Sequence, residues 1–286
     1  MRVFWKSALE TLRSVIFCCT VLFAIIFLPE YAAANPIVLA GSGSNIPAVR
    51  LLTKAFNQRH PEIQLEGPTN IGSDGAVKAV ADGAVAIGLI SRPLLGNEKN
   101  LGLAVAPYAR TAVVIGVHPQ VKDNDITFNE LNRIYRGEKT TWKNGNKIIV
   151  LSREPGESSI YVLEENVPGF REVYADSIKY NRWSIILKDE GMNQKIQTLS
   201  DSIGFSDMGA IISLKLNIKI LKLNGIYPSS KTVLNGAYPL YKTLSFVYRP
   251  DKLTPDMKAY ISYVCSPEGK NILVNNGYVP YCVHPK

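Results

Sequence analysis

An α/β fold is the class that the sequence predicts, on three observations. Short continuous apolar runs recur along the chain, as in strands that are buried on both faces. Turns rich in Gly and Ser follow several of these runs, and apolar residues at helical spacing follow the turns. The chain has 286 residues, of which 46% are hydrophobic and 20% charged, and this is enough for one large domain or two modest ones. Such alternation of strand, turn and helix is typical of a sheet covered by helices.

Residues 1–34 are expected to be an export signal that is not part of this fold. Basic residues precede an apolar run over residues 15–28, and a small-residue cleavage pattern ends at Ala34. We therefore expect cleavage after Ala34 and a periplasmic location for residues 35–286. The alternative is an uncleaved membrane anchor, which the shortness of the apolar run disfavours.

Strand-like runs and helix starts alternate through the rest of the chain. Strands are expected at residues 37–40, 63–65, 85–90, 112–117, 148–151, 203–206, 218–223 and 244–248. Helices are expected to begin at Pro47, after the turn at residues 72–75, at the capping box of Thr127 and Glu130, after Ser159, at Pro255 and at Ser266. Gly137 is expected to end the helix that the capping box opens.

The charge and the histidines of the sequence argue against nucleic-acid binding and metal binding, and its cysteines indicate a disulfide. The formal net charge is +8 at pH 7, and no block of five or six basic residues marks a nucleic-acid arm. His60, His118 and His284 form no metal-ligand pattern, so we expect no metal and no other cofactor. Cys265 and Cys282 follow the signal, and in an exported protein we expect them to form a disulfide. Two separate thiols are the alternative.

Three turns rich in Gly and Ser precede helices and are candidates for an anion site. They cover residues 41–45, 72–75 and 156–159. Helix N-termini present free N–H groups with partial positive charge, and small residues let an anion approach that backbone. Arg153 adds a guanidinium that matches a tetrahedral oxyanion. The alternative is that each turn only caps its own helix.

Two catalytic motifs are absent from the sequence. A P-loop would need a Lys where Ser73 stands, and no Gly-x-Ser-x-Gly elbow occurs. An enzyme would have to use Glu157 as general base with a Ser nucleophile, and no third group to orient them is evident in sequence. An enzymatic function is therefore the last of the hypotheses.

Several segments together resemble the phosphate-binding protein family of the high-affinity phosphate ABC transporter. They are a Gly-rich loop ending in Pro at 41–47, a Gly-Ser turn and a strand ending in Ser-Arg-x-Leu within 72–94, a helix, a Trp and an Arg loop within 126–159, and Tyr-Pro-Leu, Ser-Pro-Glu-Gly and Gly-Tyr-Val-Pro at 238–240, 266–269 and 277–280. The resemblance covers nearly the whole chain after the signal, in order.

This resemblance implies a two-lobed type II periplasmic-binding-protein fold with two hinge-crossing strands. Lobe I would be residues 35–112 with 246–286, and lobe II would be residues 113–245. The two lobes would close on the ligand like a clamp.

The resemblance also implies the ligand-binding residues. The family binds phosphate through backbone N–H groups and hydroxyls, and the matching positions here are Ser44, Asn45, Ile46, Ser73, Ser91, Arg153, Ser158 and Ser159. Asn45 replaces the usual Thr, and Ser91 stands where some members have an Asp. Pro155 replaces an acidic residue that often steadies the Arg, which leaves Glu154 as the substitute.

Glu157 departs from the family pattern, because the family has a donor Ser at this position. A carboxylate beside a doubly charged anion is repulsive. In one interpretation Glu157 points away and the site is weakened or changed. In the other, Glu157 binds the ligand by accepting the proton of hydrogen phosphate, and it then rejects sulfate, which has no proton to offer.

The function that the resemblance implies is capture of inorganic phosphate, or a similar oxyanion, by a periplasmic solute-binding protein. That protein would be a monomer, would deliver its ligand to an ABC transporter permease in the inner membrane, and would bind no nucleic acid. Two alternatives stay open. One is a binding protein for another small oxyanion, and the other is a secreted sensory or interaction protein that kept the fold without transport.

Overall fold

The computed structural model describes residues 36–283. The predicted signal peptide, residues 1–34, and its cleavage site after Ala34 lie outside these residues. Within the described chain, no helix is long and apolar enough to cross a membrane.

The strands of residues 36–283 form one ten-stranded sheet and one two-stranded sheet. They are β1 Ile37–Gly41, β2 Leu65–Asn70, β3 Ile87–Ile90, β4 Ala104–Val117, β5 Asp125–Ile126, β6 Ile149–Ser152, β7 Ser184–Ile185, β8 Ser202–Asp207, β9 Lys219–Ile220, β10 Lys222–Leu223, β11 Tyr241–Tyr248 and β12 Val279–Pro280. The large sheet has the order β2-β1-β3-β11-β4-β8-β6-β7, with β9 and β12 also paired to β4, and β10 pairs with β5.

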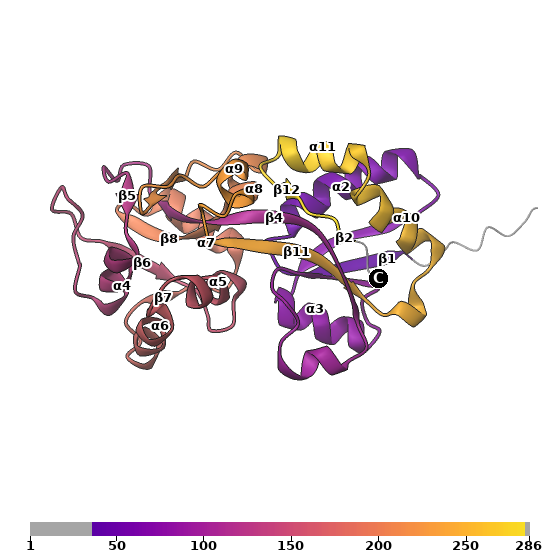
Figure 1. The fold of residues 1–286 in the computed structure, drawn as a ribbon, viewed down its shortest axis with the longest axis horizontal. Coiled ribbons are helices and arrows are strands. Elements are labelled where there is room, and N and C mark those ends of the chain that lie inside the picture. The colour runs from indigo at the N-terminus through magenta and orange to yellow at the C-terminus, as the bar shows by residue number, and fades with distance from the viewer. Residues whose placement is uncertain (1–35, 284–286) are drawn as a thin grey trace, which may run out of the picture. The chain divides into compact units, whose positions relative to one another are not determined.

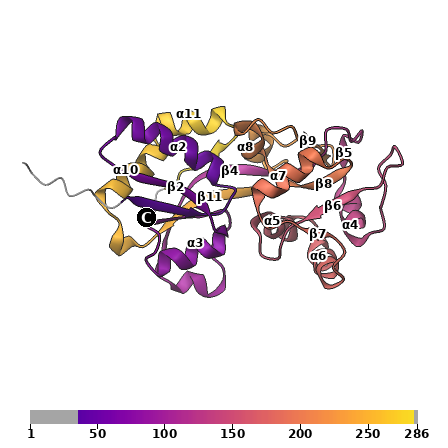
Figure 2. The same cartoon turned by 180° about the vertical axis from the view of Figure 1, so that it is seen from behind.

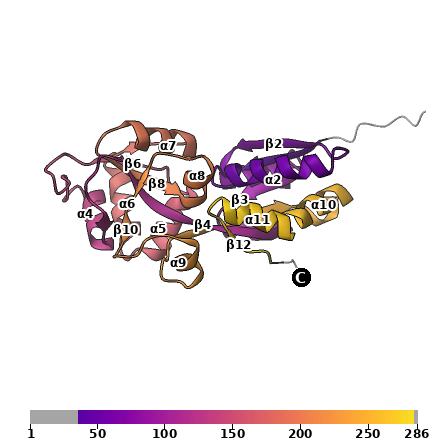
Figure 3. The ribbon, with the colours of Figure 1, turned by 90° about the horizontal axis from the view of Figure 1, so that it is seen from above.

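Helices connect these strands. They are α2 Ile46–Arg59, α3 Gly72–Ala81, α4 Phe128–Arg136, α5 Ser158–Asn166, α6 Phe170–Lys179, α7 Asp189–Thr198, α8 Met208–Ser213, α9 Ser230–Leu234, α10 Pro255–Val264 and α11 Pro267–Asn275, with short 3₁₀ helices at Gly96–Asn100 and Pro250–Lys252. Seen from behind, α2 lies next to α8 (Figure 2). From above, α10 and α11 lie beside α2 (Figure 3).

Two strands run through both halves of the large sheet. β4 and β11 pair antiparallel from Ala104 opposite Tyr248 to Ala112 opposite Tyr241, and β4 then continues alongside β8 (Figure 1). The register shifts between Leu244 and Ser245, close to Pro107 on β4, where a bulge tolerates the missing N–H of a proline. The strand predicted at residues 112–117 begins earlier in the structure, at Ala104. The prediction missed this earlier start because the preceding residues do not form a continuous apolar run.

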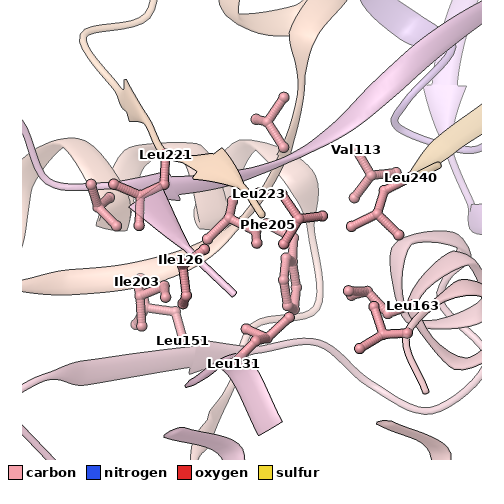
Figure 4. Packing of buried hydrophobic residues seen from close by; sticks show 14 of the residues in the cluster. Val113, Ile126, Leu131, Leu151, Leu163, Ile203, Phe205, Leu221, Leu223 and Leu240 are labelled. Atoms are coloured by element: carbon pink, nitrogen blue, oxygen red, sulfur yellow. The ribbon is translucent and has the colours of Figure 1, made fainter. Parts of the chain in front are cut away.

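Separate hydrophobic cores lie on the two sides of this crossing. One is built from residues between Ala112 and Leu240 together with Val279, and Figure 4 shows Val113, Phe205 and Leu163 packed within it. Another is built from residues between Ile37 and Ala109 and between Leu244 and Tyr278. The crossing strands β4 and β11 contribute side chains to both, so they tie the two cores together.

The C-terminal tail is fastened to this scaffold by Cys265 and Cys282. Their Sγ atoms are bonded to each other, and Cys265 is the residue that ends α10. The tail pairs through β12 with Arg110 and Ala109 of β4.

Local sequence signals predicted the positions of some helices and strands correctly and of others incorrectly. The capping box on α4 is confirmed, because Thr127 Oγ1 accepts a hydrogen bond from the Glu130 N–H and Gly137 ends the helix at φ 79°. The strand predicted at 63–65 was misplaced, since β2 covers Leu65–Asn70. β2 is an edge strand, where Gly67 and Pro68 are tolerated but give no apolar run.

The helices α6, α7, α8 and α9 were not predicted. In α7, the residue before the helix is Lys188, whose side chain makes no capping hydrogen bond. The usual sequence signal for a helix start is therefore missing where this helix begins.

Candidate functional site

A cavity of about 380 Å³ opens where loops from the two sides of the crossing meet. Its walls are Ser42 and Gly43 after β1, residues 70–74 after β2, residues 153–158 after β6 and residues 187–189 after β7. β1 pairs parallel with β2, and β6 pairs parallel with β7. The cavity therefore lies at the carboxyl ends of parallel strands, the place where open α/β sheets bind ligands.

A row of hydroxyl groups crosses from one side of the cavity to the other. Ser42 Oγ lies 2.6 Å from Ser91 Oγ, which donates to Ser158 Oγ at 3.0 Å. Ser158 Oγ in turn donates to Glu157 Oε1 at 2.9 Å. These short polar side chains are buried and hydrogen-bonded to one another, so they set the spacing of the loops around the cavity.

Arg153 is a buried cation whose guanidinium keeps hydrogen-bond donors without partners in residues 36–283. Its side chain is 4% exposed, and its Nη1 has no hydrogen-bond partner among the described residues. Nε lies 3.6 Å from Glu157 Oε2, and Nη2 lies 3.7 Å from Asp189 Oδ1. Burial opposes the charge of Arg153, but the carboxylates of Glu157 and Asp189 outweigh it and raise the pKa of the guanidinium. Glu157 and Asp189 are the acidic residues paired with Arg153 among the described residues, while Glu154, the expected substitute, adds a weaker favourable charge without an ion pair.

The carboxylate of Glu157 lies in the cavity wall, with 8% of its side chain exposed. It caps α5, because Oε2 accepts a hydrogen bond of 2.8 Å from the Ser159 N–H. Burial alone would raise its pKa, but Lys242 and Arg153 lower the pKa of Glu157 to about 2. Glu157 thus does not point away from the site, and it stands there as an anion.

Lys242 on β11 supplies the second cation of the site. Its side chain is fully buried, and Nζ lies 3.5 Å from Glu157 Oε1, 3.2 Å from Asp207 Oδ1 and 2.8 Å from Ser44 Oγ. Burial lowers the pKa of a lysine, but Asp207 and Glu157 outweigh this and raise the pKa of Lys242. The lysine thereby neutralises the carboxylate that the family pattern lacks.

Several predicted ligand residues meet at the cavity. Ser73, Arg153, Glu157 and Ser158 line it directly. Ser91 reaches it through its hydrogen bond to Ser158, and the Ser91 N–H donates to Ser73 Oγ at 3.2 Å.

The remaining predicted residues lie just behind the cavity wall. Ser44 accepts a hydrogen bond from Lys242, and Ser159 presents its N–H to Glu157. The N–H groups of Asn45 and Ile46, expected to face an anion, donate to the carbonyls of Ser42 and Gly43. Asn45 Oδ1 accepts from the Tyr108 hydroxyl at 2.7 Å, while Asn45 Nδ2 is buried without a partner among the described residues.

Arg92, which follows Ser91, is not part of the site. Its guanidinium is held by Asp74 and Glu98, with Nη1 2.7 Å from Glu98 Oε2. These carboxylates compensate the charge of Arg92, and Arg92 itself does not line the cavity, although Asp74 does.

Lys242, Asp207 and Asp189 were missed by sequence reasoning. Lys242 is the one charged residue in the segment 238–248, which is a signal for a buried charge, and Asp207 ends the largely uncharged strand β8. Asp189 carries no such signal, because it begins a helix that was itself not predicted.

The family model described as the PBP superfamily domain matches residues 29–268. The chain belongs to the PBP superfamily.

Among the relatives of this PBP-superfamily chain are proteins named as phosphate-binding proteins. The phosphate-binding protein PstS of Bacillus subtilis is 26% identical over 267 residues, covering 88% of this chain and 82% of its own length. PstS of Borreliella burgdorferi is 22% identical and covers 73% of this chain and 77% of its own length.

Solved structures agree on the fold. A substrate-binding protein from Clostridium perfringens with bound phosphate has a TM-score of 0.78 and 25% identity, covering 86% of this chain and all of its own. A phosphate transport receptor from Vibrio cholerae shares the fold with a TM-score of 0.64 and 22% identity, covering 85% of this chain and 99% of its own. The expected type II periplasmic-binding-protein fold, a mixed α/β fold around a central sheet, is confirmed.

Proposed function

We propose that this chain is a substrate-binding protein that holds inorganic phosphate in the cavity and delivers it to an ABC transporter. The buried guanidinium of Arg153 carries this proposal, because it lines a polar cavity and two of its nitrogen atoms, Nε and Nη1, have no hydrogen-bond partner among the described residues. A guanidinium with free donors binds tetrahedral oxyanions strongly. The phosphate bound in the Clostridium perfringens relative and the names of the PstS relatives support phosphate as the oxyanion.

We propose the ligand set as Arg153, the hydroxyls of Ser73, Ser91 and Ser158, and the loop that contains Ser44, Asn45 and Ile46, with Ser159 at the start of α5. Glu157 would accept the proton of hydrogen phosphate. Its low pKa supports this role, because an ionised carboxylate is an acceptor only. A site with such an acceptor discriminates against sulfate.

The cellular setting is also a proposal. The chain would be exported with cleavage after Ala34 and would work in the periplasm as a monomer. It would dock on a permease in the inner membrane and would bind its ligand without catalysing a reaction. The two cores support lobes at residues 35–112 with 246–286 and at 113–245, hinged at β4 and β11.

Titration calorimetry with phosphate and sulfate at pH 7 tests the proposal. We expect tight phosphate binding by the wild type, weaker sulfate binding, and a loss of at least about 30-fold in phosphate affinity for Arg153→Ala, since truncating one buried charged partner costs 2–5 kcal/mol. Arg171→Ala is the matched control, because Arg171 is an exposed arginine on α6 whose side chain is 59% accessible. Absence of binding to any oxyanion would favour the sensory or altered-ligand alternatives. Equal binding of phosphate and sulfate would contradict the role of Glu157.

A further inference from the structure

Asp189 is the least well partnered of the three carboxylates that surround Arg153 and Lys242. It opens α7 and lines the cavity opposite Arg153. Its only ion pair among the described residues is the 3.7 Å approach of Arg153 Nη2, and it accepts no side-chain or backbone hydrogen bond there. Glu157 and Asp207, in contrast, both lie near Lys242 as well.

The charges around the cavity do not balance before a ligand arrives. In the network of ion pairs beside the cavity, the two cations Arg153 and Lys242 face three carboxylates, Glu157, Asp207 and Asp189, at full ionisation. The lining adds Lys188, Glu154 and Asp74, of which Asp74 is paired with Arg92. A phosphate dianion would add two more negative charges in a partly buried space, where like charges repel strongly. One carboxylate must lose its charge for the dianion to bind well.

The surroundings of the three carboxylates favour Asp189 for this role. The pKa of Asp189 is raised to about 6, because burial and the carboxylates of Glu157 and Asp207 together outweigh the lowering by Arg153 and Lys242. Its other charged neighbours are Asp74, Glu154 and Lys188 in the lining of the cavity, and Arg50 and Glu190, which line an adjoining hollow together with Asp189. Glu157 has the opposite shift, so a proton that enters the site goes to Asp189 first.

We propose that Asp189 takes up a proton when phosphate binds, so that the site captures a phosphate dianion together with one proton. This inference rests on the proposed function. The proton comes from the solvent and forms an O–H bond on the carboxylate of Asp189, and the negative charge of that carboxylate is lost. The protonated group then gains a hydrogen-bond donor that it can offer to a phosphate oxygen. No bond of the phosphate is made or broken.

Calorimetric titration with inorganic phosphate at pH 8 tests the proposal. The titration is run in two buffers of different ionisation enthalpy, because the difference in observed heat reports the number of protons taken up. At this pH inorganic phosphate is chiefly the dianion. We expect uptake of about half to one proton in the wild type and below about 0.2 in Asp189→Asn, since linkage ties proton uptake to the shift of one group. Asp176→Asn, a change of the same chemistry at an exposed position on α6, should behave as the wild type.

A pH series gives a second readout. The phosphate affinity of the wild type should fall by up to about tenfold per pH unit above pH 7.5, and that of Asp189→Asn should stay level, because binding that takes up a proton is linked to pH. Asp189→Ser should behave as Asp189→Asn. Undiminished proton uptake in both variants would overturn the proposal and place the proton on phosphate or on Glu157. Phosphate binding by the wild type without proton uptake would overturn it as well. A wild type that binds no phosphate would refute the proposed function itself, and the two failures are thus distinct.

Discussion

At the scale of single residues, Lys242 decides whether the site can contain Glu157. A carboxylate in the place of a donor serine would leave a buried negative charge without compensation. The ammonium of Lys242 lies between Glu157 and Asp207, at 3.5 Å and 3.2 Å, and neutralises part of that charge. The departure from the family pattern at Glu157 is therefore accommodated by a cation that comes from a distant part of the chain.

Replacement of Lys242 by methionine should destabilise the protein by about 3–5 kcal/mol at pH 7, because two buried carboxylates lose their cation while the volume stays similar. Urea unfolding measures this change. The double variant Lys242→Met with Glu157→Gln should recover part of the loss, since one of the uncompensated charges is then gone. A single variant as stable as the wild type would show that the lysine makes no net contribution.

Glu157 should contribute strongly to the loss of folding stability that the protein shows at low pH. Its pKa in the folded state is about 2, well below its ordinary value of 4.5. A carboxyl with a depressed pKa contributes stability above its ordinary pKa and loses that contribution as the pH falls toward its folded-state value. Between pH 5 and pH 2.5 the wild type should lose about 2–3 kcal/mol more stability than Glu157→Gln, as measured by urea unfolding across this range. Parallel curves for the two proteins would contradict the assignment.

At the scale of elements, the loop between β1 and α2 approaches α7 very closely. A Cβ atom at Gly43 would lie 1.9 Å from Asp189 Oδ2 and 2.7 Å from Asn70 Nδ2. The absence of a side chain at Gly43 therefore allows the loop and the start of α7 to close one side of the cavity together.

Gly43→Ala should weaken phosphate binding by about tenfold, because the added methyl displaces Asp189 and small errors of position in a site are costly. Titration calorimetry measures the affinity. Gly67→Ala is the matched control, since a Cβ at Gly67 meets no atom within 4 Å. If both variants bind phosphate as the wild type does, close approach at Gly43 is not needed for binding.

At the scale of the whole molecule, the C-terminal tail braces the strand that connects the two cores. Val279 pairs with Arg110 of β4, and the Arg110 guanidinium lies 3.7 Å from the centroid of the Tyr281 ring. The disulfide between Cys265 and Cys282 holds this tail against α10 and α11. The tail therefore steadies β4, one of the two crossing strands.

Loss of the disulfide should lower the stability of the protein by about 3 kcal/mol, as expected for a closed loop of this length, and leave phosphate binding in place. Urea unfolding with and without reductant measures the effect on the wild type. The double variant Cys265→Ser with Cys282→Ser should be as stable as the reduced wild type and should not respond to reductant. An equal stability of oxidised and reduced protein would contradict this expectation.

Local features of the sequence determined a large part of this protein. The capping box of Thr127 and Glu130, the stop at Gly137 and the apolar runs of the buried strands were readable because each depends on neighbours within one turn or one strand. The three turns rich in Gly and Ser, and Arg153 near one of them, could be located for the same reason. In each case a strand, a small-residue turn and a helix start follow one another along the chain.

Only the tertiary structure shows which charged side chains come together at the site. Lys242, Asp207 and Asp189 come from three separate elements, and nothing in the sequence near Glu157 indicates that they meet it. Sheet pairing brings β11 and β8 to either side of β4, and this pairing places Lys242 beside Asp207. Charge interactions depend on distance in space and on burial, neither of which can be read from positions along the chain. The sequence alone therefore located the Gly- and Ser-rich turns and the arginine that adjoin the cavity, and the fold decided which charges surround them.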